Sequence, residues 1–181
     1  MAETVRVYGY HGTTTHAAAS ILREGFQISR HEYDWLGDGV YFFQDAPARA
    51  WEWATTYHGT EAAVIGALIR LEDCMDLLDI QWAPVLADAH DAFLTQLKRA
   101  NLPLPRQTSG AHRLDRAVIN YAVGILAEQG VVIRAVRGAF AEGSPVFPRS
   151  ALFDRAHVQI AIRDTSLIEA SWIMEREEGV R

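Results

Sequence analysis

Three short segments of the chain combine small residues with side chains that can bind a ligand. They are Tyr10-His11-Gly12-Thr13, Gly37-Asp38-Gly39-Val40-Tyr41-Phe42-Phe43 and His157-Val158-Gln159-Ile160. Glycine lets the backbone turn tightly and approach a ligand closely. An imidazole and a carboxamide can both donate and accept hydrogen bonds, and the Tyr41 ring offers a stacking platform while its hydroxyl stays in solvent. These residue types favour the binding of a polar ligand that carries a flat ring.

Each segment also has an ordinary structural interpretation when it is taken alone. A histidine at the end of a strand, such as His11, is usually a satisfied structural residue, and a tyrosine between apolar neighbours, such as Tyr41, is often a core aromatic. Gln159 fits an outward-facing position on an amphipathic strand, and Gly37-Asp38-Gly39 fits a hairpin turn that is also compatible with ligand binding. The three segments together favour a ligand site for His11 and Tyr41, whereas both interpretations stay open for Gln159. We interpret the five tryptophans as packing residues.

The composition predicts one globular domain that spans residues 1–181. Hydrophobic residues make up 49% of the chain and charged residues 22%, and this length suffices for one domain with a sizeable core. Cys74 is the only cysteine, which excludes an intramolecular disulfide and a cysteine-rich zinc site. His16, His112 and Asp115 show no metal-ligand spacing, so we expect no metal.

The charge and hydropathy patterns narrow the class of partner. The formal net charge of −6 argues against broad electrostatic capture of a nucleic-acid backbone. A local basic groove remains compatible with the sequence, because four arginines fall in one stretch: Arg134, Arg137, Arg149 and Arg155. The chain has no apolar run of membrane-spanning length and does not begin like a signal peptide. We therefore expect no membrane partner and a reducing, cytoplasmic setting.

Hydrophobic periodicity and turn residues predict an α+β domain. We expect strands at residues 5–10, 39–43, 62–71, 131–136, 156–163 and 168–174, and a weaker one at 75–80. We expect helices between residues 15 and 25 and at 45–57, 84–102 and 112–128. The connections are a polar loop at 27–35, a loop at 103–110, a long connection at 137–154 and a charged tail at 175–181. Loops as long as the third are usually functional or mobile.

The alternation of side chains predicts how the candidate residues are presented. In the strand at 156–163, Val158 and Ile160 point to one face, which we expect to be core, and Gln159 shares the opposite, cleft-like face with His157. His11 falls in phase with Val7, on the core side of its own strand. It therefore avoids burial only if that strand ends near His11.

In this order, the three segments resemble the three signature strands of the ADP-ribosyltransferases. The resemblance is to the histidine–tyrosine–variable branch, which includes diphtheria-type toxins and poly(ADP-ribose) polymerases. The two helices that follow the first and second segments, and the block from Arg137-Gly138-Ala139-Phe140 to Gln159, look like small bacterial members of this superfamily. The resemblance implies a split β-sandwich with flanking helices, whose central cleft holds NAD as a substrate.

The resemblance also implies roles for individual residues. His11 would hydrogen-bond the adenosine ribose, the Gly12 backbone would clamp the nicotinamide carboxamide, and Tyr41 would stack on the nicotinamide ring. Gln159 would reach the hydroxyls of the nicotinamide ribose. The expected catalytic residues are thus His11, Tyr41 and Gln159, and the expected NAD-binding residues are His11, Gly12, Thr13, Gly39 and Tyr41.

Gln159 departs from the commonest pattern of the family, in which a glutamate occupies this position. A glutamine carries no charge and cannot take a proton, so it cannot stabilise an oxocarbenium-like transition state as a carboxylate does. We expect slower chemistry, transfer of a single ADP-ribose, or an acceptor that supplies its own nucleophile. Glu142 and Arg137 are candidate accessory residues. Glu142 is a candidate substitute base or target contact, and Arg137 belongs to the set of four arginines of which we expect one or two to contact a pyrophosphate.

The expected activity is NAD-dependent mono-ADP-ribosyl transfer to a macromolecular acceptor, with release of nicotinamide. The acceptor, protein or nucleic acid, stays undecided. Resemblance alone suggests a bacterial toxin or phage-defence effector that an antitoxin protein holds in check. Two alternatives stay open: an NAD glycohydrolase with water as the acceptor, and a catalytically weak module that binds NAD or ADP-ribose.

Overall fold

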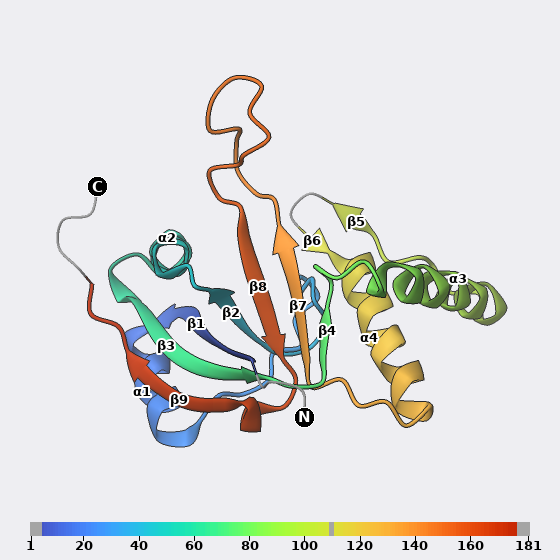
Figure 1. Ribbon diagram of the computed structural model, residues 1–181, viewed down its shortest axis with the longest axis horizontal. Coiled ribbons are helices and arrows are strands. Elements are labelled where there is room, and N and C mark those ends of the chain that lie inside the picture. Colours follow the sequence, from blue (N-terminus) through green and yellow to red (C-terminus); the bar gives the residue numbers. More distant parts are fainter. Residues whose placement is uncertain (1–4, 109–110, 177–181) are drawn as a thin grey trace.

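The computed structural model describes residues 5–108 and 111–176, and it contains one large mixed sheet flanked by helices (Figure 1). The strands lie in the order β4-β7-β8-β2-β1-β3-β9, and only the β4–β7 pair is parallel. Their bounds are β1 Val5–Thr14, β2 Val40–Gln44, β3 Ala62–Leu71, β4 Cys74–Asp76, β7 Ala135–Phe140, β8 His157–Ile162 and β9 Ile168–Ile173. The α+β class predicted from the sequence is confirmed.

The helices begin and end where the local sequence favours it. In α1 (Thr15–Glu24) the Thr14 hydroxyl accepts a hydrogen bond from the Ala17 backbone N–H at 3.1 Å, and Gly25 ends the helix with a φ of 88°, as expected of an N-cap and a C-terminal glycine. The remaining helices are α2 (Pro47–His58), α3 (Trp82–Ala100) and α4 (Arg113–Glu128). Their positions agree with the predicted ranges to within two residues at each end.

The large sheet is joined only weakly at its middle, between β1 and β2. Their register contains two residue pairs, Gly9–Gln44 and Tyr10–Phe43, whereas β1 pairs with β3 along its whole length, from Val5 to Thr14. We call this junction the seam. It divides the sheet into one half with β1, β3 and β9, and another with β2, β8, β7 and β4 (Figure 1).

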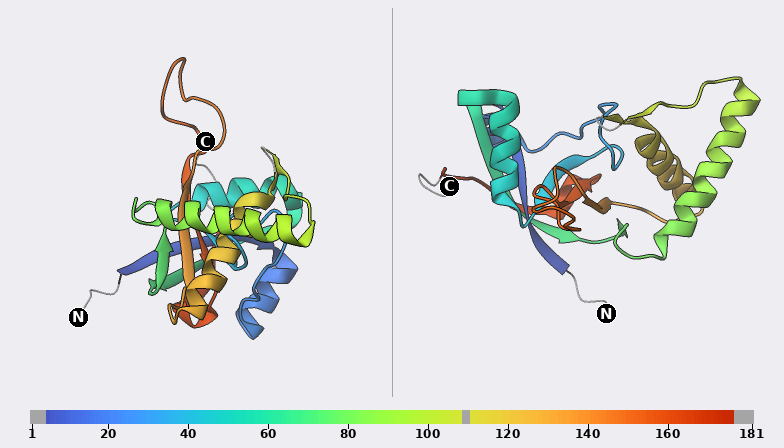
Figure 2. Two further views of the ribbon diagram at one scale, coloured as in Figure 1. Left: turned by 90° about the vertical axis from the view of Figure 1, so that its right-hand side faces the viewer. Right: turned by 90° about the horizontal axis from the view of Figure 1, so that it is seen from above.

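The two halves of the sheet face each other across a shared core. Buried side chains of β3, such as Ile69, pack in one cluster with those of β2 and β8, such as Phe42 and Ile160. A second core lies on the other side of β8, between the sheet and helices α3 and α4, and includes Leu36, Val136 and Ala161 from the sheet side. Figure 2 shows α3 and α4 on the side of the molecule opposite to α2.

The second core corrects one expectation about β8. The face that carries His157, Gln159 and Ala161 was expected to line a cleft, but Ala161 is fully buried against helix α4 and His157 is 8% exposed. Gln159 alone of these three is half-buried. The predicted cleft-like face is therefore a packed interface that opens only beside Gln159.

Several predicted boundaries are wrong. β1 does not end near His11 but continues to Thr14, because its last residues still pair with β3. The strand predicted at 131–136 is instead β7, Ala135–Phe140, and Val132 before it is 63% exposed. The weak strand predicted at 75–80 is the three-residue β4, and the loop predicted at 103–110 includes β5 (Gln107–Thr108), which pairs with β6 (Ala111–His112). Of the predicted tail, residues 177–181 lie outside the described residues.

A long hairpin connects β7 to β8 and projects from the body of the protein (Figures 1 and 2). It spans residues 141–156, so it begins later than the predicted connection at 137–154. Val146, Phe147 and Leu152 are each more than half exposed on it. Residue 157 at its base returns the chain to β8, two residues before Gln159.

Candidate functional site

The three segments singled out in the sequence line one cavity of about 770 Å³. Its wall is formed by the end of β1, helix α1, the loop from Gly25 to Trp35, strand β2, the end of α2 and the middle of β8. This volume is within the range of small-molecule sites in proteins, about 300–1,000 Å³. Every residue expected to bind NAD or act in catalysis lines it, namely His11, Gly12, Thr13, Gly39, Tyr41 and Gln159.

His11 is held as a neutral imidazole at the back of the cavity. Its Nδ1 lies 2.8 Å from the backbone carbonyl oxygen of Tyr41, and because a carbonyl can only accept, Nδ1 carries the hydrogen and Nε2 remains an acceptor. The ring packs against Phe26 and Phe42, with centroids 5.5 and 5.8 Å away. Burial lowers the pKa of His11, since a charged imidazolium is disfavoured away from water.

The strand phase of His11 places it on the core side, as expected, yet the residue also reaches the cavity. β1 continues beyond it, so the strand end that was expected to free His11 from the core is absent. The residue is half-buried because the cavity opens between α1 and the loop that follows it. The side chain thus has one nitrogen anchored to β2 and one available to a ligand.

The hydroxyl of Tyr41 is bonded to the protein, which corrects the expectation that it stays in solvent. It accepts a hydrogen bond from the backbone N–H of Leu36 at 2.8 Å and donates one to the carbonyl oxygen of Gly37 at 2.7 Å. Burial is the main cause that raises the pKa of Tyr41. The phenol therefore anchors the turn that precedes β2, while its ring lines the cavity.

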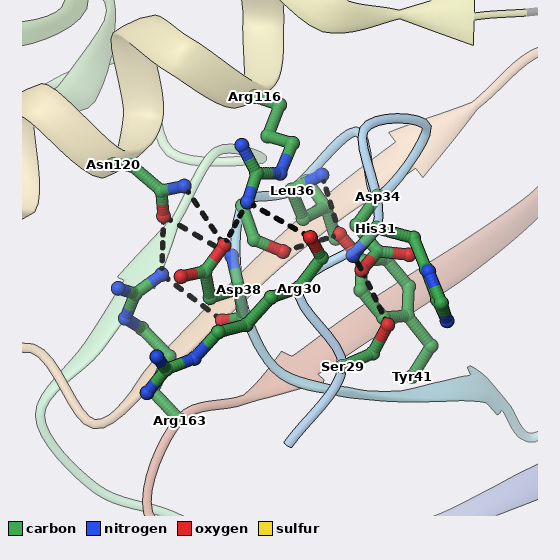
Figure 3. A network of polar contacts seen from close by, with 11 residues as sticks. Ser29, Arg30, His31, Asp34, Leu36, Asp38, Tyr41, Arg116, Asn120 and Arg163 are labelled. Carbon is green, nitrogen blue, oxygen red and sulfur yellow. Dashed lines mark hydrogen bonds and ion pairs between the residues drawn. The ribbon is translucent and has the colours of Figure 1, made fainter.

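That turn is also fixed to helix α4 by a polar network around Asp38 (Figure 3). The Asp38 carboxylate accepts hydrogen bonds from Arg116 at 2.6 Å and from the Asn120 amide at 3.0 Å. Arg163, which follows β8, donates to the Asp38 carbonyl oxygen at 3.0 Å. Gly37 has a φ of 84°, and a Cβ there would lie 2.6 Å from Asn120 Oδ1, so both backbone conformation and space require glycine.

A second polar cluster holds the loop that covers the cavity on one side (Figure 3). Asp34 is 8% exposed, and its carboxylate accepts hydrogen bonds from the Ser29 hydroxyl and from the His31 backbone N–H. The backbone of Ser29 pairs with that of Gly39 through bonds of 3.0 and 3.1 Å. Because buried carboxylates need such partners, Asp34 ties the loop to itself and to the start of β2.

Gln159 projects from β8 toward Trp35, which lies on the same loop. The Trp35 indole N–H donates a hydrogen bond to the Gln159 side-chain oxygen, Oε1. The indole also packs against Phe140, with ring centroids 4.7 Å apart, and against Gly138. Trp35 and Gln159 are both part of the cavity wall.

Gly12 has a packing role in addition to its place in the cavity wall. A Cβ at this position would lie 2.9 Å from the Trp53 ring and 3.0 Å from the carbonyl oxygen of Ala50. Helix α2 can therefore approach β1 closely because Gly12 has no side chain. Its position is explained by helix–sheet packing whether or not its backbone also meets a ligand.

The two candidate accessory residues do not line the cavity. Arg137 lies in β7 and its guanidinium pairs with Asp76 and with the Gln44 side chain, both at 2.7 Å. Glu142 lies at the base of the projecting hairpin and pairs with Arg49. The other arginines of the basic stretch also lie elsewhere: Arg134 pairs with Asp164 and Glu72, and Arg155 with Glu52.

The cavity contains residues that the sequence pattern did not assign to a ligand site. Trp35 and Trp53 line it, although all tryptophans were interpreted as packing residues. His16, on the first turn of α1, and Asp34 line it as well. Trp35 begins the stretch that leads into the Gly37-Asp38-Gly39 turn, but it was interpreted as a packing residue, and His16 was considered only as a metal ligand. Trp53 and Asp34 gave no local signal of a ligand site.

The ionisable and polar groups of the cavity wall include histidines, the acidic residues Glu24 and Asp34, and the start of a helix. Among the described residues, no lysine or arginine lines it, but four histidines do. The N-terminus of α1, which lies at the wall, carries a partial positive charge. Within the described parts of the chain, no three histidine, cysteine or acidic side chains form a group that could hold a metal ion.

No protein-family model matches the chain, and no protein of curated function matches its sequence. In residues 5–108 and 111–176, no helix is both long and apolar enough to cross a bilayer.

Proposed function

We propose that the protein is an NAD-dependent mono-ADP-ribosyltransferase with a split β-sandwich fold. The observation that carries the proposal is the convergence of His11, Tyr41 and Gln159, from β1, β2 and β8, on one cavity of about 770 Å³. The seam and the two facing halves of the sheet support the sandwich. The sequence pattern alone predicts these residues, so their convergence on one cavity supports the proposal.

The geometry suits the two ends of a dinucleotide. Nε2 of the neutral His11 can accept a hydrogen bond from a ribose hydroxyl, and the Tyr41 ring, fixed through its hydroxyl, can stack on the nicotinamide. The pyrophosphate would meet the N-terminus of α1 and His16, since helix N-termini favour anions. Holding the ribose in one orientation supplies much of the catalysis expected of such a site.

In the proposed reaction, the bond between the anomeric carbon of the ribose and the nicotinamide nitrogen breaks. Its electron pair leaves with the nitrogen, so that the cationic ring becomes neutral nicotinamide. An oxygen or nitrogen of the acceptor then bonds to the anomeric carbon and loses a proton. Gln159 cannot take this proton, so it passes to solvent or to a basic group of the acceptor.

A second candidate is a module that binds NAD or ADP-ribose without turnover. The observation that favours it is Gln159 itself, because no carboxylate stands at the third signature position. The cavity, the neutral His11 and the stacking ring would serve binding equally well. The two candidates therefore differ in nicotinamide release and not in affinity.

The deciding experiment combines NAD with purified protein and with the protein and nucleic acid of an expressing cell. Nicotinamide release together with a modified macromolecule, identified by mass spectrometry, supports the transferase. Free ADP-ribose without a modified macromolecule indicates a glycohydrolase, and binding without nicotinamide release indicates the binding module. Absence of NAD binding refutes the transferase and the glycohydrolase, and absence of both NAD and ADP-ribose binding refutes all three.

Site variants make the test specific. We expect His11→Ala and Tyr41→Ala, each checked for folding by circular dichroism, to lose NAD binding and activity. His90→Ala on α3 and Tyr8→Ala on the outer face of β1 are matched controls, since neither residue lines the cavity. Equal activity of the site variants and the controls would refute the assignment.

A toxin held in check by a partner protein is part of the same proposal, as is a cytoplasmic site of action. Growth arrest on expression of wild type, but not of His11→Ala, is the expected outcome. Normal growth with the wild-type protein present in quantity would contradict this part and leave the enzymatic proposal intact.

A further inference from the structure

The side-chain amide of Gln159 has a defined orientation because of the residue it contacts. An indole N–H can donate a hydrogen bond but cannot accept one. The atom of Gln159 that faces Trp35 Nε1 is therefore the carbonyl oxygen, Oε1. The other end of the amide, the NH₂ group, points away from Trp35, and within the described residues it has no protein partner.

The position of Trp35 is itself over-determined by packing. Gly138 of β7 lies opposite Gln159 of β8 in the sheet register, and a Cβ on Gly138 would lie 3.1 Å from the Trp35 ring. The missing side chain leaves room for the indole beside Gln159. Phe140 covers the indole at a centroid distance of 4.7 Å, and the bonds of Asp34 hold the adjoining loop.

From this geometry we infer that Trp35 is the positioning residue for Gln159, and that it turns the amide so that its NH₂ group faces the cavity as a hydrogen-bond donor. The consequence for the reaction rests on the proposed function. A donor directed at the oxygen of a ribose hydroxyl withdraws electron density from the sugar, whereas a carboxylate in the same place would accept from that hydroxyl and stabilise the cationic transition state. The wild-type site thus binds the ribose but releases nicotinamide slowly.

The same contact makes the site ready for a carboxylate. In Gln159→Glu, the Trp35 N–H can donate to one carboxylate oxygen, which leaves the other oxygen directed at the ligand as an acceptor. We expect this variant to release nicotinamide at least about tenfold faster than wild type, which is a conservative value for one electrostatic contact in a preorganised site. The gain should vanish in the Trp35→Phe/Gln159→Glu double variant, because the carboxylate is then no longer oriented.

The first arm of the test needs no ligand. In a ¹⁵N-labelled sample, the indole N–H signal of Trp35 is the one that disappears in Trp35→Phe. We expect Gln159→Leu to shift this signal and to leave the other indole signals in place. An unchanged Trp35 signal in Gln159→Leu would overturn the inference.

The second arm measures nicotinamide release, with kcat and KM determined separately. Trp35→Phe keeps an aromatic ring against Phe140 but removes the donor, so the amide can turn its carbonyl oxygen toward the ribose. We therefore expect KM to rise, because the oriented donor to the ribose is lost, while kcat does not fall and the melting temperature stays close to that of wild type. Trp172→Phe on β9 is the matched control, since its indole donates only to the Met174 sulfur and it lies outside the cavity wall. We expect it to change neither constant.

The two arms separate the two ways in which the reasoning can fail. If wild type binds no NAD, the proposed function fails, and the Trp35 signal alone decides the orientation of Gln159. If NAD binds and Gln159→Glu releases nicotinamide no faster than wild type, the proposed role of the donor is overturned while the NAD site stands.

Discussion

The hydroxyl of Tyr41 predicts a large effect for the removal of one atom. In Tyr41→Phe the ring remains, but the Leu36 N–H and the Gly37 carbonyl oxygen lose the partners that lie 2.8 and 2.7 Å away. Leu36 is fully buried, so water cannot easily replace the hydroxyl at its backbone. Two backbone groups are thus left without partners in a turn that also carries the wall of the cavity.

The expected loss of stability in Tyr41→Phe follows from the free energy that an unpaired buried polar group costs. Leaving a buried donor or acceptor unsatisfied costs about 1–3 kcal/mol. Gly37 is buried as well, but a carbonyl oxygen tolerates the loss of one partner better than an N–H does, so we expect the free energy of unfolding to fall by about 2 kcal/mol. For a chain of this length, this corresponds to a melting temperature lower by about 4–8 °C. The Leu36 amide should exchange its hydrogen about 30-fold faster.

Thermal unfolding and amide hydrogen exchange measure these two quantities directly. Tyr10→Phe is the matched control, because the Tyr10 hydroxyl makes no hydrogen bond within the described residues, and its melting temperature should stay within about 2 °C of wild type. A Tyr41→Phe protein that melts like wild type and protects the Leu36 amide as well would show that the hydroxyl does not anchor the turn. The assignment of Tyr41 as a rigid platform would then fail.

Three further predictions concern packing, charge and pH. Gly12→Ala places a methyl group 3.0 Å from a backbone oxygen of α2 and should lower the free energy of unfolding by about 1–3 kcal/mol. The control is Gly124→Ala in α4, where nothing lies within 4 Å of the added methyl group, and this variant should raise the free energy of unfolding by about 0.5–1 kcal/mol. Equal effects of the two variants in urea unfolding would contradict the packing explanation. Asp38→Asn removes the charge that faces Arg116 at 2.6 Å. Since both side chains are about a quarter exposed, the free energy of unfolding should fall by only about 1 kcal/mol, and by less in high salt. A fall that does not depend on salt would refute the ionic explanation. Burial lowers the pKa of His157 from its ordinary 6.5, so in acid the folded state binds fewer protons than the unfolded state, and the free energy of unfolding should fall as the pH drops below about 6.5. In His157→Gln the urea midpoint should fall less over this pH range than in wild type. Parallel plots of urea midpoint against pH for the two proteins would contradict this assignment.

Local patterns predicted most of the elements of this fold. The helix at 112–128 is predicted from the turn residues that bound it, in the loop at 103–110 and at Gly130, and α4 spans Arg113–Glu128. The strand predicted at 131–136 shows where local patterns fail, because β7 is Ala135–Phe140. Val131 and Val132 read as a strand but are exposed, whereas Gly138 read as a loop residue but lies inside the strand, where its missing side chain makes room for Trp35.

The candidate site could be predicted in its members but not in its connections. Glycines and polar side chains at strand edges are local signals, and they pointed to His11, Tyr41 and Gln159. The contact between Trp35 and Gln159 joins residues 124 positions apart, and no periodicity encodes it. The Tyr41 hydroxyl bonds to backbone groups only five and four residues away, but no periodicity encodes the turn that brings them to it, so the expectation that the hydroxyl is solvated was wrong.

The seam between β1 and β2 has a consequence for how the empty protein behaves. Two register pairs join the strands here, together with a bond from the Asp45 N–H to the Tyr8 carbonyl oxygen and the side-chain bond from His11 to the Tyr41 carbonyl oxygen. This junction has the fewest register pairs in the large sheet. His11 and Tyr41 lie on opposite sides of the seam, so a ligand that contacts both residues adds a link between the two halves of the sheet. In ligand-free protein we therefore expect transient opening of the β1–β2 pair. Saturating the cavity with ligand should slow amide hydrogen exchange at Gly9 and Gln44, although neither residue lines the cavity.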